Sequence, residues 1–114
     1  MTKWPPRSVP LTGASNMGAV NRTDLQAVVG APCPYCGFIM ERRGNHPTRD
    51  RIIPGHRGGT YAPRNVEIVC QTCNNDKGQL SLVAFHAALA VENDHRAGRV
   101  AAVIAERKAK GLPV

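Results

Sequence analysis

Apolar and polar positions divide the chain into three parts. Residues 1–20 contain prolines and small polar residues without an apolar period, which predicts a flexible N-terminal arm. Residues 21–80 alternate short apolar runs with turn residues, as expected for short strands and helices. Residues 81–114 show helical spacing of apolar positions. We therefore expect an arm, a central unit and a C-terminal helical extension.

The central unit is predicted to contain a short helix followed by a hairpin. The helix begins with a capping box formed by Thr23 and Gln26, and Gly30 ends it. Residues 48–53 and 65–69 have the composition of two strands. The glycine-containing segment between them predicts an irregular loop.

The segment after the hairpin predicts three helices. A short one covers residues 70–77 and ends at Gly78. The next begins at the N-cap Ser81, where Leu80 and Phe85 form a hydrophobic staple. The last begins after Asn93 or Asp94, runs to about residue 110 and carries basic residues on its predicted exposed side: Arg96, Arg99, Arg107 and Lys108. We therefore expect an α+β fold.

Four cysteines form two Cys-x-x-Cys pairs, Cys33 with Cys36 and Cys70 with Cys73, separated by 33 residues. Each pair can direct two thiolates at one tetrahedral ion, so we predict a structural zinc. Disulfides or unrelated buried thiols are the alternatives. Disulfides require an oxidising compartment, and the first ten residues lack the apolar core of a signal peptide. We expect a cytoplasmic protein that does not span a membrane.

Composition adds a strong basic charge and a small core. The formal net charge is +7, and only five residues are aromatic, so a metal would compensate for a small apolar core. Residues 41–64 contain six arginines, from Arg42 to Arg64, but only two acidic residues, Glu41 and Asp50. This cluster predicts a surface for a polyanion, and a solvated surface is the alternative.

Residues from Cys33 to Gly78 resemble the zinc-binding branch of the HNH endonuclease family, which is often found in phages. The resemblance lies in Asp50-x-Ile-Ile-Pro, Gly58-Gly59, Asn65-Val and Cys70-x-x-Cys-Asn-x-x-Lys-Gly. It implies a small ββα-metal, treble-clef-like unit built around a zinc ion with four cysteine ligands. It also implies a DNA partner and, for phage proteins, partners in genome packaging or restriction.

The resemblance further implies a catalytic divalent ion. Asp50 and Asn74 match the family's ligand positions, and their hard oxygen atoms suit Mg²⁺ or Mn²⁺. A salt bridge with a neighbouring arginine is the alternative for Asp50, and a helix cap is the alternative for Asn74. Asn65 matches the asparagine that positions the catalytic loop, or else it simply ends a turn.

The general base departs from the family pattern. Arg51 occupies the position of the usual histidine, and a guanidinium cannot accept a proton near neutral pH. Arg51 is instead predicted to hold the scissile phosphate. His56 in the following loop is the predicted base, with a solvent-exposed loop histidine as the alternative. His46 lies four residues before Asp50, about 13 Å along an extended strand, which is too far for a base unless the chain bends.

The predicted function is metal-dependent hydrolysis of DNA phosphodiester bonds. The alternative is an HNH-like zinc module that binds nucleic acid without cutting it, which Arg51 motivates. Predicted DNA contacts are the basic residues around the motif: Arg49, Arg51, Arg57, Arg64 and Lys77. An ordinary solvent-facing lysine is the alternative for Lys77. The sequence does not determine the recognition site or the oligomeric state.

Overall fold

The computed structural model describes residues 18–114. Most of the predicted N-terminal arm, residues 1–17, lies outside this range. Of the arm's last three residues, Val20 is fully buried, and its backbone N–H donates to the Tyr61 carbonyl at 2.8 Å. The chain is therefore tied to the central unit from Val20 onward.

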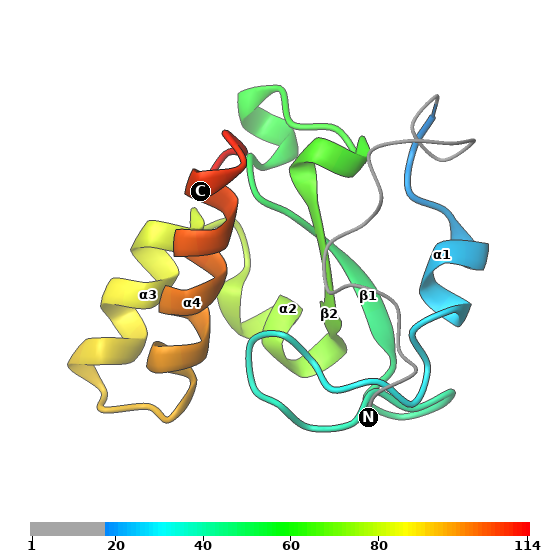
Figure 1. Ribbon diagram of the computed structural model, residues 1–114, viewed down its shortest axis with the longest axis horizontal. Helices are drawn as coiled ribbons and strands as arrows, with labels where there is room; N and C mark the ends of the chain where they lie inside the picture. Colours follow the sequence, from blue (N-terminus) through cyan, green and yellow to red (C-terminus); the bar gives the residue numbers. More distant parts are fainter. Residues whose placement is uncertain (1–17) are drawn as a thin grey trace.

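A two-stranded antiparallel sheet lies at the centre of the described residues (Figure 1). Strand β1 spans Pro47–Arg51 and β2 spans Val66–Cys70. Pro47 pairs with Cys70, and Asp50 pairs with Glu67. Each strand is therefore slightly offset from its predicted range, and the predicted hairpin is present.

Helices cover both faces of this hairpin. Helix α1, Arg22–Gln26, contacts β1, and the cluster beside it contains Val66 and Ile68. Val69 points to the other face, where it joins the main core. That core lies beneath helices α2, α3 and α4, which are on the opposite side of the hairpin from α1 in Figure 1.

Helix α1 begins at a different capping box from the predicted one. Asn21 is the N-cap and accepts a hydrogen bond from the Asp24 N–H, while the Asp24 carboxylate accepts from the Asn21 N–H. The prediction of Thr23 as N-cap was therefore wrong. The backbone contact of Val20 explains this, because it holds the chain just ahead of Asn21 and the helix begins at Arg22.

Helix α2 spans Gln71–Lys77 and lies against the hairpin. Cys70 is its N-cap, and its sulfur accepts a hydrogen bond from the Cys73 N–H. Gly78 ends the helix with a φ of 57°, which glycine adopts without steric cost. The predicted start and stop of this helix are confirmed.

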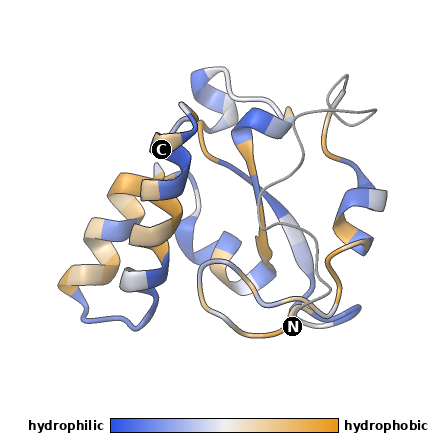
Figure 2. Cartoon of the chain, in the orientation of Figure 1, coloured by the Kyte–Doolittle hydropathy of each residue, from blue (hydrophilic) through white to orange (hydrophobic). Residues whose placement is uncertain are grey.

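Helices α3, Leu82–Val91, and α4, Arg96–Ala109, pack against each other at one end of the molecule (Figure 1). Ser81 caps α3 as predicted, and Val100 and Val103 of α4 are buried. Figure 2 shows that α3 is hydrophobic over most of its length. Short 3-10 helices, η2 at Gly55–Arg57 and η3 at Pro63–Asn65, occupy the connection between the strands.

Helix α4 begins slightly later than its predicted cap. Its N-cap position is His95, whose side chain makes no capping hydrogen bond. The Asp94 carboxylate, one of the two predicted caps, accepts instead from the Arg96 N–H at 2.8 Å. Asp94 therefore still satisfies one of the free N–H groups at the start of the helix.

Two basic residues of α4 are not on an exposed face as predicted. Arg107 is 1 % exposed, and its guanidinium is paired with buried Glu67 of β2 at 2.7 Å. Arg96 is mostly buried and pairs with Asp76 and Asp94. These ion pairs bind α4 to the central unit. Within residues 18–114, no helix is long and apolar enough to cross a bilayer.

Candidate active site and metal centre

The four cysteines converge on one buried point. Their sulfur atoms all lie within 4.8 Å of one another, and the Cys36 and Cys70 sulfurs are 3.8 Å apart. A tetrahedral ion with Zn–S bonds of about 2.3 Å requires sulfur atoms about 3.8 Å apart. The four-cysteine cluster therefore has the geometry of a structural zinc site.

Nearby N–H groups surround this four-cysteine cluster. The sulfur of Cys33 accepts from the N–H groups of Tyr35 and Cys70, each at 3.4 Å. The hydrogen bond from the Cys73 thiol and the backbone N–H groups lower the pKa of the Cys33 thiol to about 5. Such bonds stabilise thiolates and orient them toward a metal. The donor set fits zinc, with four protein ligands and no open position.

Arg96 connects the four-cysteine cluster with the C-terminal helices. Its guanidinium donates to the Cys73 sulfur at 3.6 Å and to Asp76 at 2.8 Å. The same guanidinium holds both carboxylate oxygens of Asp94. Arg96 therefore places a positive charge beside the four-cysteine cluster, a role that the sequence pattern did not reveal.

A pocket of about 150 Å³ lies between β1, α2 and the loop that joins the strands. It brings together three of the residues predicted for catalysis, Asp50, Arg51 and Asn74. Its full lining is Arg49, Asp50, Arg51, Pro54, Tyr61, Asn74, Gly78 and Gln79. We call it the β1–α2 pocket.

Asp50 lies at the buried side of this pocket and is 1 % exposed. Its Oδ2 accepts from the Tyr35 hydroxyl at 2.6 Å, and its Oδ1 accepts from the Lys77 ammonium at 3.0 Å. Burial raises the pKa of Asp50, and the positive charge of Lys77 acts against this shift. The carboxylate therefore has a resident positive partner.

Lys77 is not the solvent-facing or phosphate-binding lysine predicted from its helical position. Its side chain is fully buried, and its ammonium contacts both Asp50 and the Arg51 carbonyl. Because α2 packs this side against β1, the ammonium lies inside the protein. This burial leaves it no exposed charge for a DNA phosphate.

Asn74 connects α2 to β1 across the β1–α2 pocket. Its Nδ2 donates to the Thr48 hydroxyl at 3.0 Å and to the Arg49 carbonyl at 3.1 Å. Among the residues that the structure describes, none donates a hydrogen bond to its Oδ1. The orientation of the amide thus leaves one hard oxygen donor free.

Two guanidinium groups lie against Tyr61 at the β1–α2 pocket. The Cζ atom of Arg49 is 3.8 Å from the centre of the Tyr61 ring, and that of Arg51 is 4.6 Å from it. Residues two apart on a strand point to the same face, so these arginines lie opposite Asp50. Within residues 18–114, neither arginine has a carboxylate partner. They supply positive charge for an anion.

Asn65 holds the loop after β1. Its side chain accepts from the Ile53 N–H at 2.8 Å and donates to the carbonyls of Ile53 and Thr60. Gly59 lies in the same turn, where an added Cβ would be 1.6 Å from the Ile53 carbonyl oxygen. This is the geometry expected of a positioning residue, and the catalytic role of Asn65 stays a prediction.

The two candidate bases lie away from the β1–α2 pocket. His56 is exposed on η2, and His46 lines a separate groove beside α1, with its Nδ1 2.8 Å from the Gly44 carbonyl. Arg57 is exposed on η2, and Arg64 is exposed beside Gly111, whose carbonyl accepts from it. The structure therefore brings neither histidine to Asp50.

Sequence reasoning missed two aromatic partners of this site, Tyr35 and Tyr61. Tyr35 could have been found from its place inside the first Cys-x-x-Cys pair, which fixes it near the metal centre. Tyr61 has no such local signal, because it reaches the arginines only through the fold of the interstrand loop.

The fold and site define a ββα unit with a buried cluster of four cysteines that could hold a zinc ion. Residues 33–80 match the family model of the HNH endonuclease. This part of the chain is therefore similar to HNH endonucleases, a class of nucleases. No curated protein and no solved structure matches the chain.

Proposed function

We propose that the protein is a metal-dependent HNH endonuclease that hydrolyses DNA phosphodiester bonds at the β1–α2 pocket. One observation carries this proposal: the pocket combines the oxygen donors of Asp50 and Asn74 with the guanidinium of Arg51. Oxygen donors suit a hard cation, and arginine suits a phosphate. These are the cation-binding and phosphate-binding groups that phosphodiester hydrolysis requires.

The donor chemistry fits the divalent ion that HNH nucleases use. Asn74 has an unused Oδ1, and each ionised carboxylate oxygen of Asp50 can accept one bond beyond those from Tyr35 and Lys77. Bound Mg²⁺ or Mn²⁺ would stabilise negative charge at phosphorus and on the leaving oxygen. Because Lys77 already neutralises Asp50, we expect weak binding of the ion.

The chain's own residues have three proposed tasks. Arg51 binds the scissile phosphate, and Asn65 holds the loop from Ile53 to Thr60 in place. His56 is the proposed base that accepts the proton of the attacking water. Because His56 is exposed on η2, this role requires the loop to bring its ring to the substrate.

A second candidate function is binding of nucleic acid without cleavage. Three features favour it: Arg51 stands where the family has a histidine, Lys77 neutralises Asp50, and the pocket lining contains no histidine among the described residues. For either function, the proposed location is the cytoplasm of a bacterial or phage-infected cell. Phage packaging and restriction remain proposals for its biological setting.

A plasmid-nicking assay tests the nuclease proposal. Zinc-loaded protein would be compared in Mg²⁺, Mn²⁺ and EDTA, together with Asp50→Asn, Asn74→Ala and the control Asn75→Ala. Asn75 is the exposed neighbour of Asn74 on α2. We expect ion-dependent nicking that falls at least about 100-fold in Asn74→Ala and is retained in Asn75→Ala, because a lost ion ligand removes transition-state stabilisation.

Three other results would contradict parts of the nuclease proposal. Folded protein that binds DNA but never nicks it would establish the second candidate function. Full activity in both Asp50→Asn and Asn74→Ala would exclude the β1–α2 pocket as the active site. Unchanged activity of His56→Ala across the pH range would remove His56 alone from the mechanism.

A further inference from the structure

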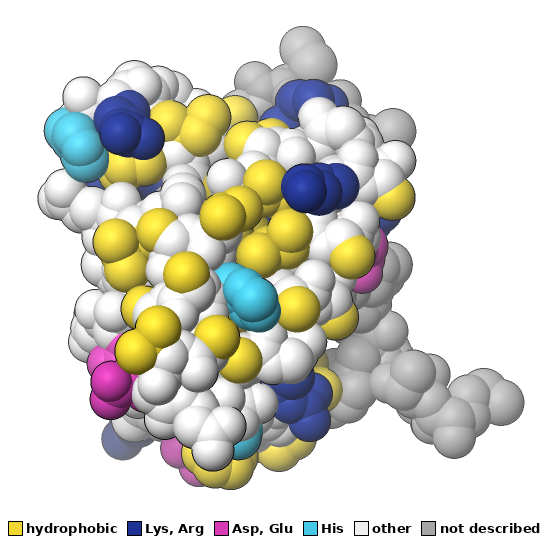
Figure 3. All heavy atoms as spheres, turned by 90° about the vertical axis from the view of Figure 1, so that its left-hand side faces the viewer, with side chains coloured by type: hydrophobic (Ala, Val, Ile, Leu, Met, Phe, Trp, Pro, Cys, Tyr) yellow, Lys and Arg dark blue, Asp and Glu magenta, His cyan; other side chains and the backbone are white. Residues whose placement is uncertain are grey.

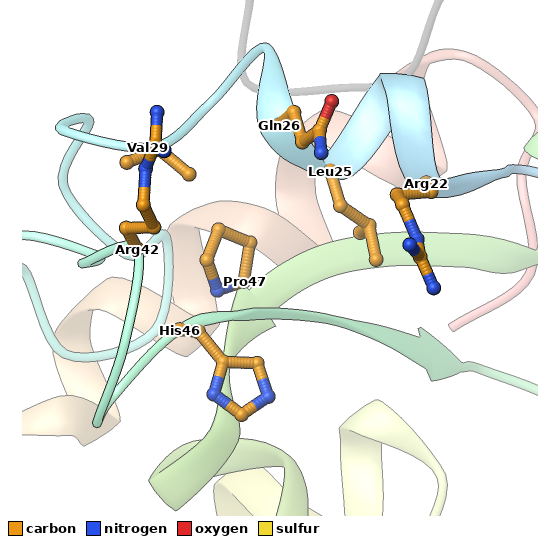
Figure 4. A pocket seen from close by; sticks show the side chains of 7 residues that line it. All are labelled: Arg22, Leu25, Gln26, Val29, Arg42, His46 and Pro47. Atoms are coloured by element: carbon orange, nitrogen blue, oxygen red, sulfur yellow. The ribbon is translucent and has the colours of Figure 1, made fainter.

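A groove of about 460 Å³ lies between α1 and the beginning of β1 (Figure 4). Four lining residues come from α1 and the turn after it: Arg22, Leu25, Gln26 and Val29. The other three come from the segment that leads into β1: Arg42, His46 and Pro47. We call this the α1 groove, and nothing in the HNH pattern predicts it.

The lining has positive ends and an apolar middle. Figure 4 shows Arg22 and Arg42 on opposite sides of the α1 groove, with Leu25 and Pro47 between them. Both arginines are exposed, and neither has a carboxylate partner among residues 18–114. This arrangement suits a ligand with negative charges separated by a less polar part.

The acidic groups nearest in sequence do not line the α1 groove. The Asp24 carboxylate is used in the α1 capping box, where it accepts from the Asn21 N–H at 2.9 Å. The Glu41 carboxylate lies beside Gly44 in the following turn. The lining itself contains basic, polar and apolar residues without an acid. Its charge therefore favours an anion.

His46 adds a further polar contact. Its Nδ1 lies 2.8 Å from the Gly44 carbonyl, which accepts a hydrogen bond, so Nε2 is the ring nitrogen left for a ligand. The side chain of His46 is half-buried, which limits the positions that the ring can take.

The α1 groove and the β1–α2 pocket both have lining residues on one face of β1. Pro47 lines the groove, Arg49 and Arg51 line the pocket, and all three point to the same face of the strand. From Pro47 to Arg51 the strand rises about 13 Å, at about 3.3 Å per residue. One DNA strand advances about 3.4 Å per nucleotide, so the two sites are about four nucleotides apart.

The opposite end of the molecule has a different character. Figure 3 shows the side formed by α3 and α4, where hydrophobic side chains predominate and charged ones are sparse. Val83 and Val91 are among its exposed side chains. The α1 groove, with its paired arginines, lies on the other side of the hairpin (Figure 1). Its charge, and its place on the same strand as the β1–α2 pocket, favour one DNA strand over an acidic peptide.

We infer that the α1 groove is a second phosphodiester-binding site, which holds the DNA strand about four nucleotides from the β1–α2 pocket. Arg22 and Arg42 bind phosphates, while the sugars lie over Leu25 and Pro47. The inference rests on the proposed action on DNA. The proposed subsite determines how long a strand must be to occupy both sites. Binding at this subsite does not require cleavage.

The test measures binding without cleavage. Zinc-loaded full-length protein and a fluorescent duplex of about 20 base pairs would be titrated by anisotropy in Ca²⁺ without Mg²⁺, at several salt concentrations. The test variant is Arg22→Ala with Arg42→Ala. The matched control is Lys108→Ala with Lys110→Ala, since both residues are exposed and neither lines the α1 groove.

We expect the test variant to bind at least about 10-fold more weakly, with a salt slope lower by about two, because each phosphate contact contributes about 0.9 to that slope. The control should bind nearly as the parent does. A single-stranded oligonucleotide of about three nucleotides, too short to reach both sites, should reduce the difference between parent and test variant.

Other outcomes overturn the inference. Equal affinities and slopes in the test and control variants would remove the α1 groove from the DNA-binding surface while leaving the proposed nuclease intact. Absence of DNA binding by folded parent protein would refute the proposed function as well. Binding of an acidic peptide by the parent but not by the test variant, with equal DNA binding by both, would assign the groove to a protein partner.

Discussion

Asp50 is a buried carboxylate with two specific partners, the Tyr35 hydroxyl and the Lys77 ammonium. Burial raises its pKa, and Lys77 offsets part of that effect. A buried ion pair contributes little net stability, yet removal of one partner leaves an uncompensated charge. Stability should therefore fall most when only one of the two residues, Asp50 or Lys77, is replaced.

The first prediction concerns this asymmetry. We expect Lys77→Met to lower the free energy of unfolding by about 3 to 5 kcal/mol, because Asp50 would remain buried without its positive partner. Urea denaturation of the zinc-loaded protein measures the change. Lys108→Met is the control, since Lys108 is exposed on α4.

The double variant Lys77→Met with Asp50→Asn separates charge from packing. If the buried charge is the cause, the double variant should recover much of the lost stability. A double variant that is less stable than Lys77→Met alone would contradict this account and assign the loss to packing.

At the scale of elements, the loop between the strands depends on close backbone contact. Asn65 holds this loop through three hydrogen bonds, and Gly59 leaves no room for a side chain beside the Ile53 carbonyl. The loop carries His56 and ends near Tyr61, so its shape affects both the proposed base and the ring against which the arginines lie.

The second prediction tests that contact. Gly59→Ala should destabilise the protein by about 3 kcal/mol or more, since its Cβ would overlap a backbone oxygen. Gly98→Ala is the matched control, because no atom lies within 4 Å of its added Cβ inside α4, and there alanine should stabilise by up to about 1 kcal/mol. Thermal unfolding compares the two. Equal stability of both variants would contradict the observed loop geometry.

Helix α4 is bound to the hairpin by a second buried ion pair. Arg107 donates to Glu67 at 2.7 Å and also to the carbonyls of Arg64 and Pro113. Glu67 faces the same side of the sheet as Asp50, its cross-strand neighbour. Two carboxylates are thus buried side by side, each with its own cation from a different helix.

The third prediction follows from this contact. Arg107→Met should lower the free energy of unfolding by about 3 to 5 kcal/mol, because the buried Glu67 carboxylate would lose its ion pair with Arg107. The exposed neighbour variant Lys108→Met should change it by less than about 0.5 kcal/mol. Urea denaturation followed by circular dichroism measures both. Similar values for the two variants would show that the ion pair does not hold α4.

At the scale of the whole molecule, the metal centre joins segments that are distant in sequence. The first cysteine pair precedes β1, the second lies at the junction of β2 and α2, and Arg96 links α4 to Cys73. The apolar core beside it contains all four cysteines. Metal binding and folding should therefore be coupled.

The fourth prediction concerns metal removal. We expect one zinc ion per chain by elemental analysis and loss of cooperative unfolding after chelation, with recovery when zinc is restored. Cys73→Ser should bind zinc more weakly, because it removes one of four ligands. Metal-free protein that unfolds at the same temperature as the zinc-loaded form would contradict a structural role.

Local patterns were sufficient for the order of the elements and for the metal centre. Cysteine spacing, the Ser81 cap, Gly78 and the two short strands act through neighbours in the chain, so their signals are visible in the sequence. The motif also indicated Asp50 and Asn74, which the structure brings to one pocket. Their catalytic roles stay predictions.

Tertiary packing decided the partners and the burial of charged residues. Lys77 lies 27 residues from Asp50, and Arg107 lies 40 residues from Glu67, so no local pattern distinguishes these cations from solvent-facing ones. The α1 groove likewise exists only because α1 packs against β1. A long polar side chain can face solvent or be buried with the same local sequence around it, and the choice depends on which distant group meets it.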